Sequence, residues 1–94
     1  MSLLENFSNP TIVSQKAKKI YGNNVEIKPS TRKDKKYMIR NPSTNKYIHF
    51  GQLGYEDYTK HQDEKRRENY LKRNAIYKDA DRYTAGYMAY HLLW

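Results

Sequence analysis

The sequence predicts a small α+β domain, and three stretches of the chain support this prediction. Residues 10–22 carry apolar side chains at helical spacing, and residues 24–51 contain three short alternating segments separated by turn residues. Residues 55–94 return to helical patterns. Ninety-four residues suit one domain. We therefore expect an N-terminal helix, a three-stranded antiparallel meander, and two or three C-terminal helices packed on the sheet.

The first nine residues form a short apolar arm that contains Leu3, Leu4 and Phe7. The arm either packs on its own domain or docks on a neighbouring molecule. Asn9 and Pro10 then begin a helix, because Asn is a good N-cap and Pro suits the first helical position. The spacing predicts a helix over about residues 10–20, ended by Gly22.

The predicted meander consists of three strands. Val25–Lys28 alternates apolar and polar residues, Lys36–Arg40 does so again after a basic turn, and Tyr47–Phe50 forms the third strand. The residues between the second and third strands, 41–45, are typical of a turn. We expect Gly51 to end the third strand.

The C-terminal part should contain one long helix and one short helix. Residues 55–58 have the pattern of a single helical turn, and either Thr59 or Asp63 could cap a helix over roughly 60–73. This helix is polar on almost every side, which is typical of a solvent-bridging helix or an interaction surface. A short helix over about 84–92 should pack on the sheet.

The composition is basic and lacks cysteine. Lys and Arg number 18 against 10 Asp and Glu, which gives a formal net charge of +8. Without cysteine there is no disulfide framework and no thiolate zinc site. No apolar run approaches the roughly 20 residues that span a bilayer, and the N-terminus lacks a secretory-signal pattern. We expect a soluble intracellular protein with no membrane partner.

The predicted core is thin and rich in tyrosine. Leu, Ile, Val and Phe together make up only 16 of the 94 residues, whereas the chain contains ten tyrosines and one tryptophan. Tyrosine can bury a large ring while its hydroxyl keeps a polar partner.

The segment from Phe50 to Asn74 has the sequence FGQLGYEDYTKHQDEKRRENYLKRN. It resembles a family of small basic proteins, without an assigned function, from large DNA viruses of eukaryotes and related viral sequences. The resemblance covers roughly positions 25–94 and implies a viral origin, without implying an activity or site residues. Many relatives have histidine where this chain has Asn74. The matching positions are Phe50, Gly51, Asp57, Tyr58, Thr59, His61, Asp63, Arg66, Arg67, Tyr70, Arg73, Thr84, Ala85, Gly86, Leu92, Leu93 and Trp94.

Two basic segments, residues 28–40 and the predicted helix over about 60–73, form the candidate nucleic-acid-binding surface. Phosphate contact is the commonest reason for such charge in a small domain, and interleaved tyrosines could stack on bases or sugars. Helical spacing of i, i+4, i+7 brings Arg66, Tyr70 and Arg73 together. An acidic protein surface would explain the same charge. The candidate phosphate-binding residues are Lys33, Lys35, Lys36, Arg40, Arg66, Arg67 and Arg73.

Asp57, His61 and Asp63 are the residues closest to a catalytic or metal-binding pattern. We favour a structural interpretation, in which Asp63 caps a helix and Asp57 pairs with His61 or a nearby arginine. A metal site for hydrolysis usually gathers more acids than any part of this chain does. Gly51 and Gly54 match neither a Walker loop nor a dinucleotide fingerprint, so no cofactor is expected.

The chain ends on Leu92, Leu93 and Trp94. These residues should plug the core, and the alternative is that they dock on another subunit together with Tyr70.

The sequence therefore favours a non-enzymatic viral protein that binds nucleic acid through phosphates, in genome organisation or packaging. Its partner would be DNA, bound without sequence specificity. The protein would act in the virion or in the infected host cell. The alternative is a minor capsid or core protein of the virion, whose basic face and termini dock on acidic virion proteins. The sequence leaves open the oligomeric state and the choice of DNA or RNA.

Overall fold

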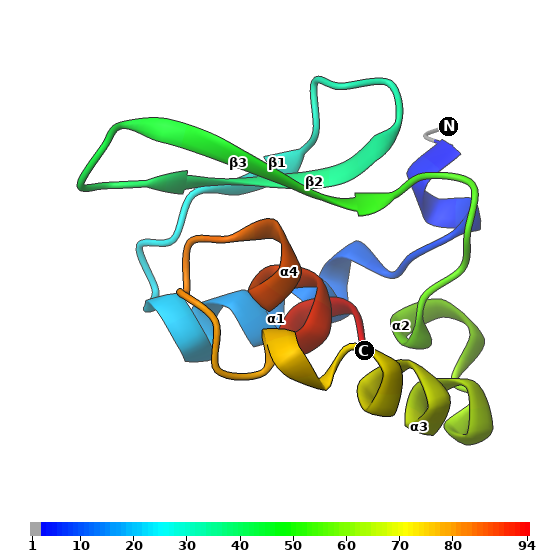
Figure 1. Cartoon of the computed structure of the whole chain (residues 1–94). Coiled ribbons are helices and arrows are strands. Elements are labelled where there is room, and N and C mark those ends of the chain that lie inside the picture. The colour runs from blue at the N-terminus through cyan, green and yellow to red at the C-terminus, as the bar shows by residue number, and fades with distance from the viewer. Residues whose placement is uncertain (1–2) are drawn as a thin grey trace.

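The computed structural model describes residues 3–94. Residues 1–2 of the predicted arm, and the side chain of Leu3, lie outside this description. The order of elements confirms the predicted α+β fold (Figure 1). The elements are the 3-10 helix η1 (Leu3–Asn6), α1 (Pro10–Tyr21), β1 (Ile27–Pro29), β2 (Lys35–Asn41), β3 (Lys46–Gln52), α2 (Tyr58–His61), α3 (Glu64–Arg73), the 3-10 helix η2 (Ala75–Tyr77), α4 (Ala85–Met88) and the π-helical turn η3 (Ala89–Leu93).

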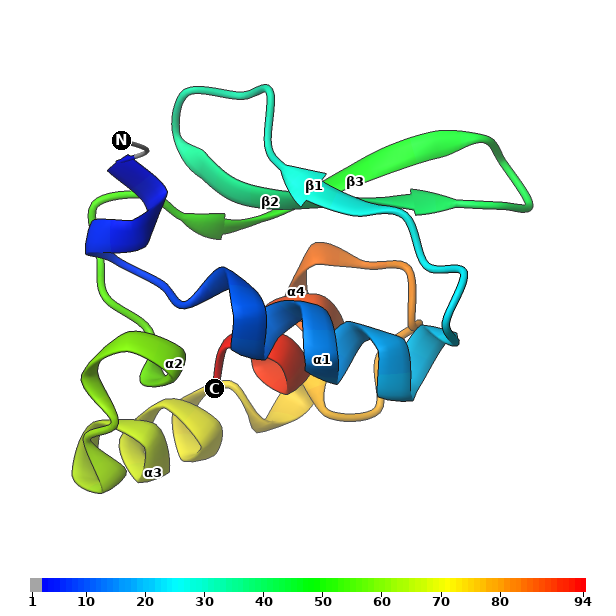
Figure 2. The same ribbon diagram turned by 180° about the vertical axis from the view of Figure 1, so that it is seen from behind.

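The three strands form one antiparallel sheet in the order β1-β2-β3. Ile39 in the central strand pairs with Ile27 on one side and with Ile48 on the other. Figures 1 and 2 show α1, α3 and α4 on one side of this sheet, with η1 at its end. The fold is therefore a sheet layer covered on one face by a helical layer.

The core is mainly aliphatic, so the prediction of a tyrosine-rich core is wrong. Among the described residues Tyr37 is the one tyrosine in the buried cluster. Most other tyrosines are part-buried, and two of them, Tyr21 and Tyr83, pack against the cluster. The hydroxyl of Tyr21 donates to the carbonyl of Arg82. The buried cluster consists of Leu4, Val13, Ala17, Tyr37, Ile39, Phe50, Met88, Leu92 and Leu93.

Local signals set the ends of α1 as predicted. The side chain of Asn9 accepts hydrogen bonds from the backbone amides of Thr11 and Ile12. Pro10 occupies the first turn, and Gly22, with a φ of 96°, follows the last helical residue. One face of α1 packs into the core and against η3, and Val13 and Ala17 on that face are fully buried.

The predicted single helix over 60–73 is wrong, because the chain forms two helices there. Asp57 caps α2 by accepting from the amide of Thr59, and Asp63 caps α3 by accepting from the amides of the two residues at positions 65 and 66. Gln62 lies between them in the left-handed conformation, with a φ of 56°. A left-handed residue ends the first helix, so the second must start from its own cap. The helical turn predicted over residues 55–58 does not form there, because α2 begins only at Tyr58.

Candidate functional site

A groove runs between the β3–α2 connection, α3 and the C-terminal helix. Two adjoining hollows, of about 540 Å³ and 260 Å³, form it and share Tyr55, Glu56, Tyr70 and Trp94. We refer to it as the aromatic groove. The other residues that line it are Lys35, Lys36, Gly51, Gln52, Arg66, Asn69, Arg73, Tyr77, Ala85, Gly86, Ala89 and Leu93.

Four aromatic rings contribute to the groove wall. Tyr70 and Trp94 stack on each other, with ring centroids 4.4 Å apart and planes inclined by 8°. Tyr55 is 70% exposed and Tyr77 is 42% exposed. The groove therefore presents a fixed aromatic pair beside two rings that reach into solvent.

Besides the buried Lys36, which is paired with Asp57, three cations border the same groove. Lys35 lines the larger hollow, whereas Arg66 and Arg73 line the smaller one. Arg66, Tyr70 and Arg73 thus share one face of α3, as their spacing predicted. Among the described residues neither arginine forms an ion pair, and Glu56 is the one acid in the lining. The groove has a net positive border.

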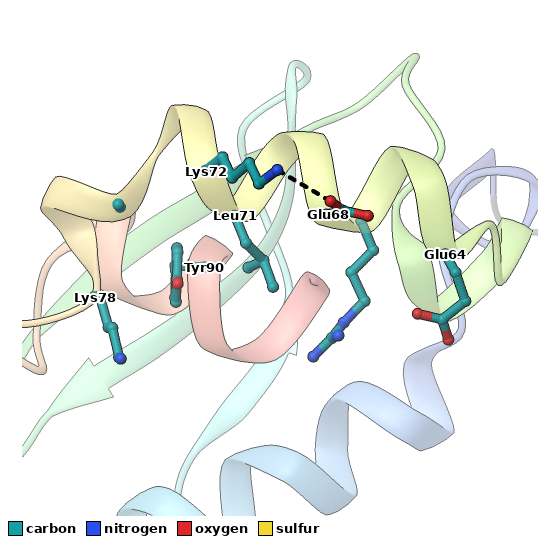
Figure 3. Close-up of a pocket in the computed structure, with 8 residues that line it drawn as sticks. Glu64, Glu68, Leu71, Lys72, Lys78 and Tyr90 are labelled. Atoms are coloured by element: carbon teal, nitrogen blue, oxygen red, sulfur yellow. Dashed lines mark ion pairs between the residues drawn. The ribbon is translucent and has the colours of Figure 1, made fainter.

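The opposite face of α3 borders a different hollow of about 530 Å³ (Figure 3). Its charges are mixed and partly paired, since Lys72 lies 3.0 Å from Glu68. Both side chains are exposed to solvent, which screens their attraction, so this pair adds little to stability. We do not assign a site to this hollow, which is lined by Glu64, Arg67, Glu68, Leu71, Lys72, Ala75, Lys78 and Tyr90.

Arg67 makes structural contacts away from the aromatic groove, and its role as a phosphate ligand stays a prediction. Its Nε donates a hydrogen bond of 2.7 Å to the carbonyl oxygen of Trp94. Its guanidinium also lies over the ring of Tyr58, 5.2 Å from the centroid. Arg67 therefore fixes the position of Trp94 in the groove wall, and it does not share the face of α3 that carries Arg66.

Lys36 is also structural, and its prediction as a phosphate ligand is corrected. Its side chain is only 3% exposed, and its Nζ lies 2.9 Å from Oδ2 of Asp57 and 3.4 Å from the carbonyl oxygen of Phe7. Burial lowers the pKa of Lys36, and the charge of Asp57 opposes that shift. Asp57 lies 21 residues away in the sequence, so strand alternation alone could not predict the pair.

The same carboxylate ends a buried chain of hydroxyl groups. Tyr37 donates to Oγ of Ser8 at 2.7 Å, and Ser8 lies 3.2 Å from Oγ1 of Thr59. Thr59 in turn donates its hydroxyl to Asp57. This network joins the N-terminal segment, β2 and α2 around the buried ion pair.

The remaining predicted cations lie apart from the groove wall. Lys33 is exposed in the turn between β1 and β2, two residues before Lys35. Arg40 lies near the opposite end of β2, where it donates to the side chain of Asn45 and approaches Glu26 at 3.9 Å. The structure therefore brings Lys35, Arg66 and Arg73 around one feature and leaves Arg40 outside it.

Comparison with known families adds one match. A family model described as a family of unknown function (DUF5754) matches residues 25–74. The chain belongs to this family. The comparisons with curated proteins and with solved structures found no match.

The DUF5754 segment spans the sheet, α2 and α3. It contains all three cations of the groove border, together with Tyr55 and Tyr70. Tyr77, Gly86 and Trp94 lie C-terminal to the matched residues. No helix in the part of the chain that the structure describes has the length and apolar character needed to cross a bilayer.

His61 has a packing role in this segment. Asp63 caps α3 as predicted, whereas the predicted pairing of Asp57 with His61 or a nearby arginine is wrong because Asp57 binds Lys36 instead. The Nδ1 atom of His61 accepts from the amide of Asp63 at 2.9 Å, and its ring lies 5.1 Å from that of Trp94. Its Nε2 is buried without a hydrogen-bond partner, and burial lowers the pKa of His61. Within residues 3–94 no three His, Cys, Asp or Glu side chains gather as metal ligands would.

The C-terminal residues divide between core and groove. Leu92 and Leu93 are buried in the core, which confirms the prediction of a core plug and contradicts their use in docking. Tyr70 and Trp94 stack in the groove wall instead of projecting as a free tail.

Sequence reasoning missed Tyr55, Tyr77 and Gly86 as members of the site. The ring of Tyr77 lies against Gly86, where a Cβ would come within 2.3 Å of Cδ1 of the tyrosine. Glycine permits this close approach, and the two residues come from different elements. No local pattern marks such a contact, and the exposure of Tyr55 at 70% follows only from the folded chain.

Proposed function

We propose that the chain binds nucleic acid through phosphate contacts and catalyses no reaction. The observation that carries the proposal is the positive border of the aromatic groove, formed by Lys35, Arg66 and Arg73. Lys33 adds a further exposed cation in the turn just before Lys35. Each cation that neutralises a phosphate releases condensed counterions, and this term dominates binding that is not sequence-specific.

The state of these cations supports the proposal. Arg66 and Arg73 are exposed and form no ion pair among the described residues, so binding a phosphate would break no existing contact. The formal net charge of +8 favours approach to any polyanion. A non-catalytic role fits the packing of His61, since the neighbouring Asp57 is engaged by Lys36.

The resemblance of residues 50–74 to small basic proteins of large DNA viruses supplies the proposed setting. We propose that binding serves to organise or package a viral genome, in the virion or in the infected cell. Non-specific phosphate contacts suit such a role, because packaging proteins must bind every sequence of a genome.

The test is the binding of a fluorescently labelled random-sequence duplex by the protein and by two variants of equal charge. Arg66→Ala/Arg73→Ala removes two cations from the groove border, whereas Lys19→Ala/Lys46→Ala removes two exposed cations far from it. We expect the groove variant to lose at least tenfold in affinity and the control variant to lose less than threefold. Equal losses in the two variants would show that binding depends on net charge and not on the groove. No binding by the unchanged protein at low salt would refute the proposal.

A structural role in the virion is the second candidate. Ile76 is 81% exposed and adjoins Tyr77, so this corner of the molecule presents an apolar surface that a protein partner could cover. The burial of Leu92 and Leu93 within the chain removes the docking segment expected for this role. Two results together would favour this role: the chain binds purified virion proteins and loses that binding in the Ile76→Asp variant, and the unchanged chain does not bind nucleic acid.

A further inference from the structure

We propose that the aromatic groove stacks unpaired bases, so that the chain prefers single-stranded to duplex nucleic acid. This inference rests on the proposed function and adds the form of the nucleic acid and the side chains that contact its bases.

Exposed aromatic rings concentrate at the groove. Among the described residues the large apolar side chains that are exposed are Tyr55, Ile76 and Tyr77, and the two tyrosines line the groove. Tyrosines are usually part-buried, so a ring that is 70% exposed, as in Tyr55, gains little from its own fold. Bases stack on such rings irrespective of sequence.

Tyr77 is held with one face occupied. A Cβ on Gly86 would lie 2.3, 2.7 and 2.8 Å from three ring atoms of Tyr77, which shows that the ring rests directly on the glycine backbone. Tyr77 as a whole residue is nevertheless 42% exposed, so part of its side chain remains open to a ligand. A ring supported on one face and open on the other is a stacking platform with little conformational freedom to lose.

The cations and the rings are arranged in a suitable order. Lys35 borders the larger hollow, the two arginines border the smaller one, and Tyr55, Tyr70 and Trp94 belong to both. A strand whose phosphates pass from Lys35 to Arg66 therefore crosses the shared rings. In a single strand the bases can turn toward those rings, whereas in a duplex they are stacked on one another and paired.

The experiment compares an oligothymidylate of about 12 nucleotides with a random-sequence duplex of the same length, at one salt concentration. Anisotropy of a labelled oligonucleotide gives the affinities, and the fluorescence of Trp94, the single tryptophan, reports on the groove itself. The variants are Tyr55→Leu, which removes an exposed ring, and Gly86→Ala, which displaces the ring of Tyr77 without removing charge. Tyr47→Leu, in the sheet and away from the groove, is the matched control.

We expect the single strand to bind about tenfold more tightly than the duplex and to quench Trp94. Tyr55→Leu and Gly86→Ala should each weaken single-strand binding about five- to tenfold, with duplex binding and the Tyr47→Leu control unchanged. The inference would be overturned if the duplex bound as tightly as the single strand or more tightly, and Tyr55→Leu left single-strand binding unchanged. That result would leave the proposed function standing. Failure to bind either form would overturn both.

Discussion

Breaking the buried pair between Lys36 and Asp57 should destabilise the fold severely. Lys36→Met keeps a long unbranched side chain but removes the charge, and it leaves a carboxylate buried among Thr59 and its neighbours. Asp57→Asn keeps an acceptor that can still cap α2 but leaves the ammonium without its counter-charge. Removing one partner of a buried pair costs about 3–5 kcal/mol.

That cost is a large part of the stability that a chain of this length can have. At about 0.05–0.15 kcal/mol per residue, the free energy of unfolding is roughly 5–14 kcal/mol. With a urea m-value near 1 kcal/mol/M, each single variant should lower the urea midpoint by about 3 M or more. The double variant neutralises both groups, so it should cost about 1–3 kcal/mol less than the sum of the single variants.

Urea denaturation followed by circular dichroism measures these values. The matched control is the exposed pair Glu68–Lys72, where Lys72→Met should leave the urea midpoint almost unchanged. Losses below about 1 kcal/mol in both Lys36→Met and Asp57→Asn would refute the view that this pair holds the fold together. An additive double variant would refute the direct coupling.

Three further predictions concern single residues. Gly51 has a φ of 80°, and a Cβ there would lie 2.9 Å from Cδ1 of Leu93, so Gly51→Ala should cost about 2–4 kcal/mol in urea denaturation. Gly22→Ala, with a φ of 96° and open space, should cost only about 1 kcal/mol, and a larger cost there would contradict the role of the close contact. Because burial lowers the pKa of His61 in the folded chain, the unfolded chain binds more protons below about pH 6.5, and stability should fall as the pH drops from 7.5 to 5. His61→Asn should show a smaller fall between these two pH values, and an equal fall would refute the assignment. Burial raises the pKa of the Tyr37 phenol, so stability should decline above about pH 10, where the unfolded chain loses its proton first, and Tyr37→Phe should reduce that decline.

Local signals account for what the sequence could predict. Asn9, Pro10 and Gly22 set the ends of α1, because a cap, a first-turn proline and a glycine act within a few residues of one another. The alternating strands and the turn at 41–45 likewise gave the sheet and its antiparallel order. The break at Gln62 was missed because no glycine or proline marks it, although two aspartates six residues apart were a usable sign of two caps.

The site depended on contacts that no local pattern carries. No local pattern separates the buried Lys36 from Lys35 beside it, and its partners, Asp57 and the carbonyl of Phe7, come from distant parts of the chain. Arg66 and Arg67 are adjacent in sequence but border different hollows, since successive helical residues point about 100° apart. Tyr77 joins the groove only because Gly86 lets its ring approach.

The most direct test of the central claim is the salt dependence of oligonucleotide binding. If Arg66 and Arg73 each contact a phosphate, the slope of log K against log salt should decrease in magnitude by about 1.4 for a single strand or 1.8 for a duplex in the Arg66→Ala/Arg73→Ala variant. The Lys19→Ala/Lys46→Ala variant should keep the slope of the unchanged protein. Equal slopes in all three proteins would contradict phosphate binding at the aromatic groove.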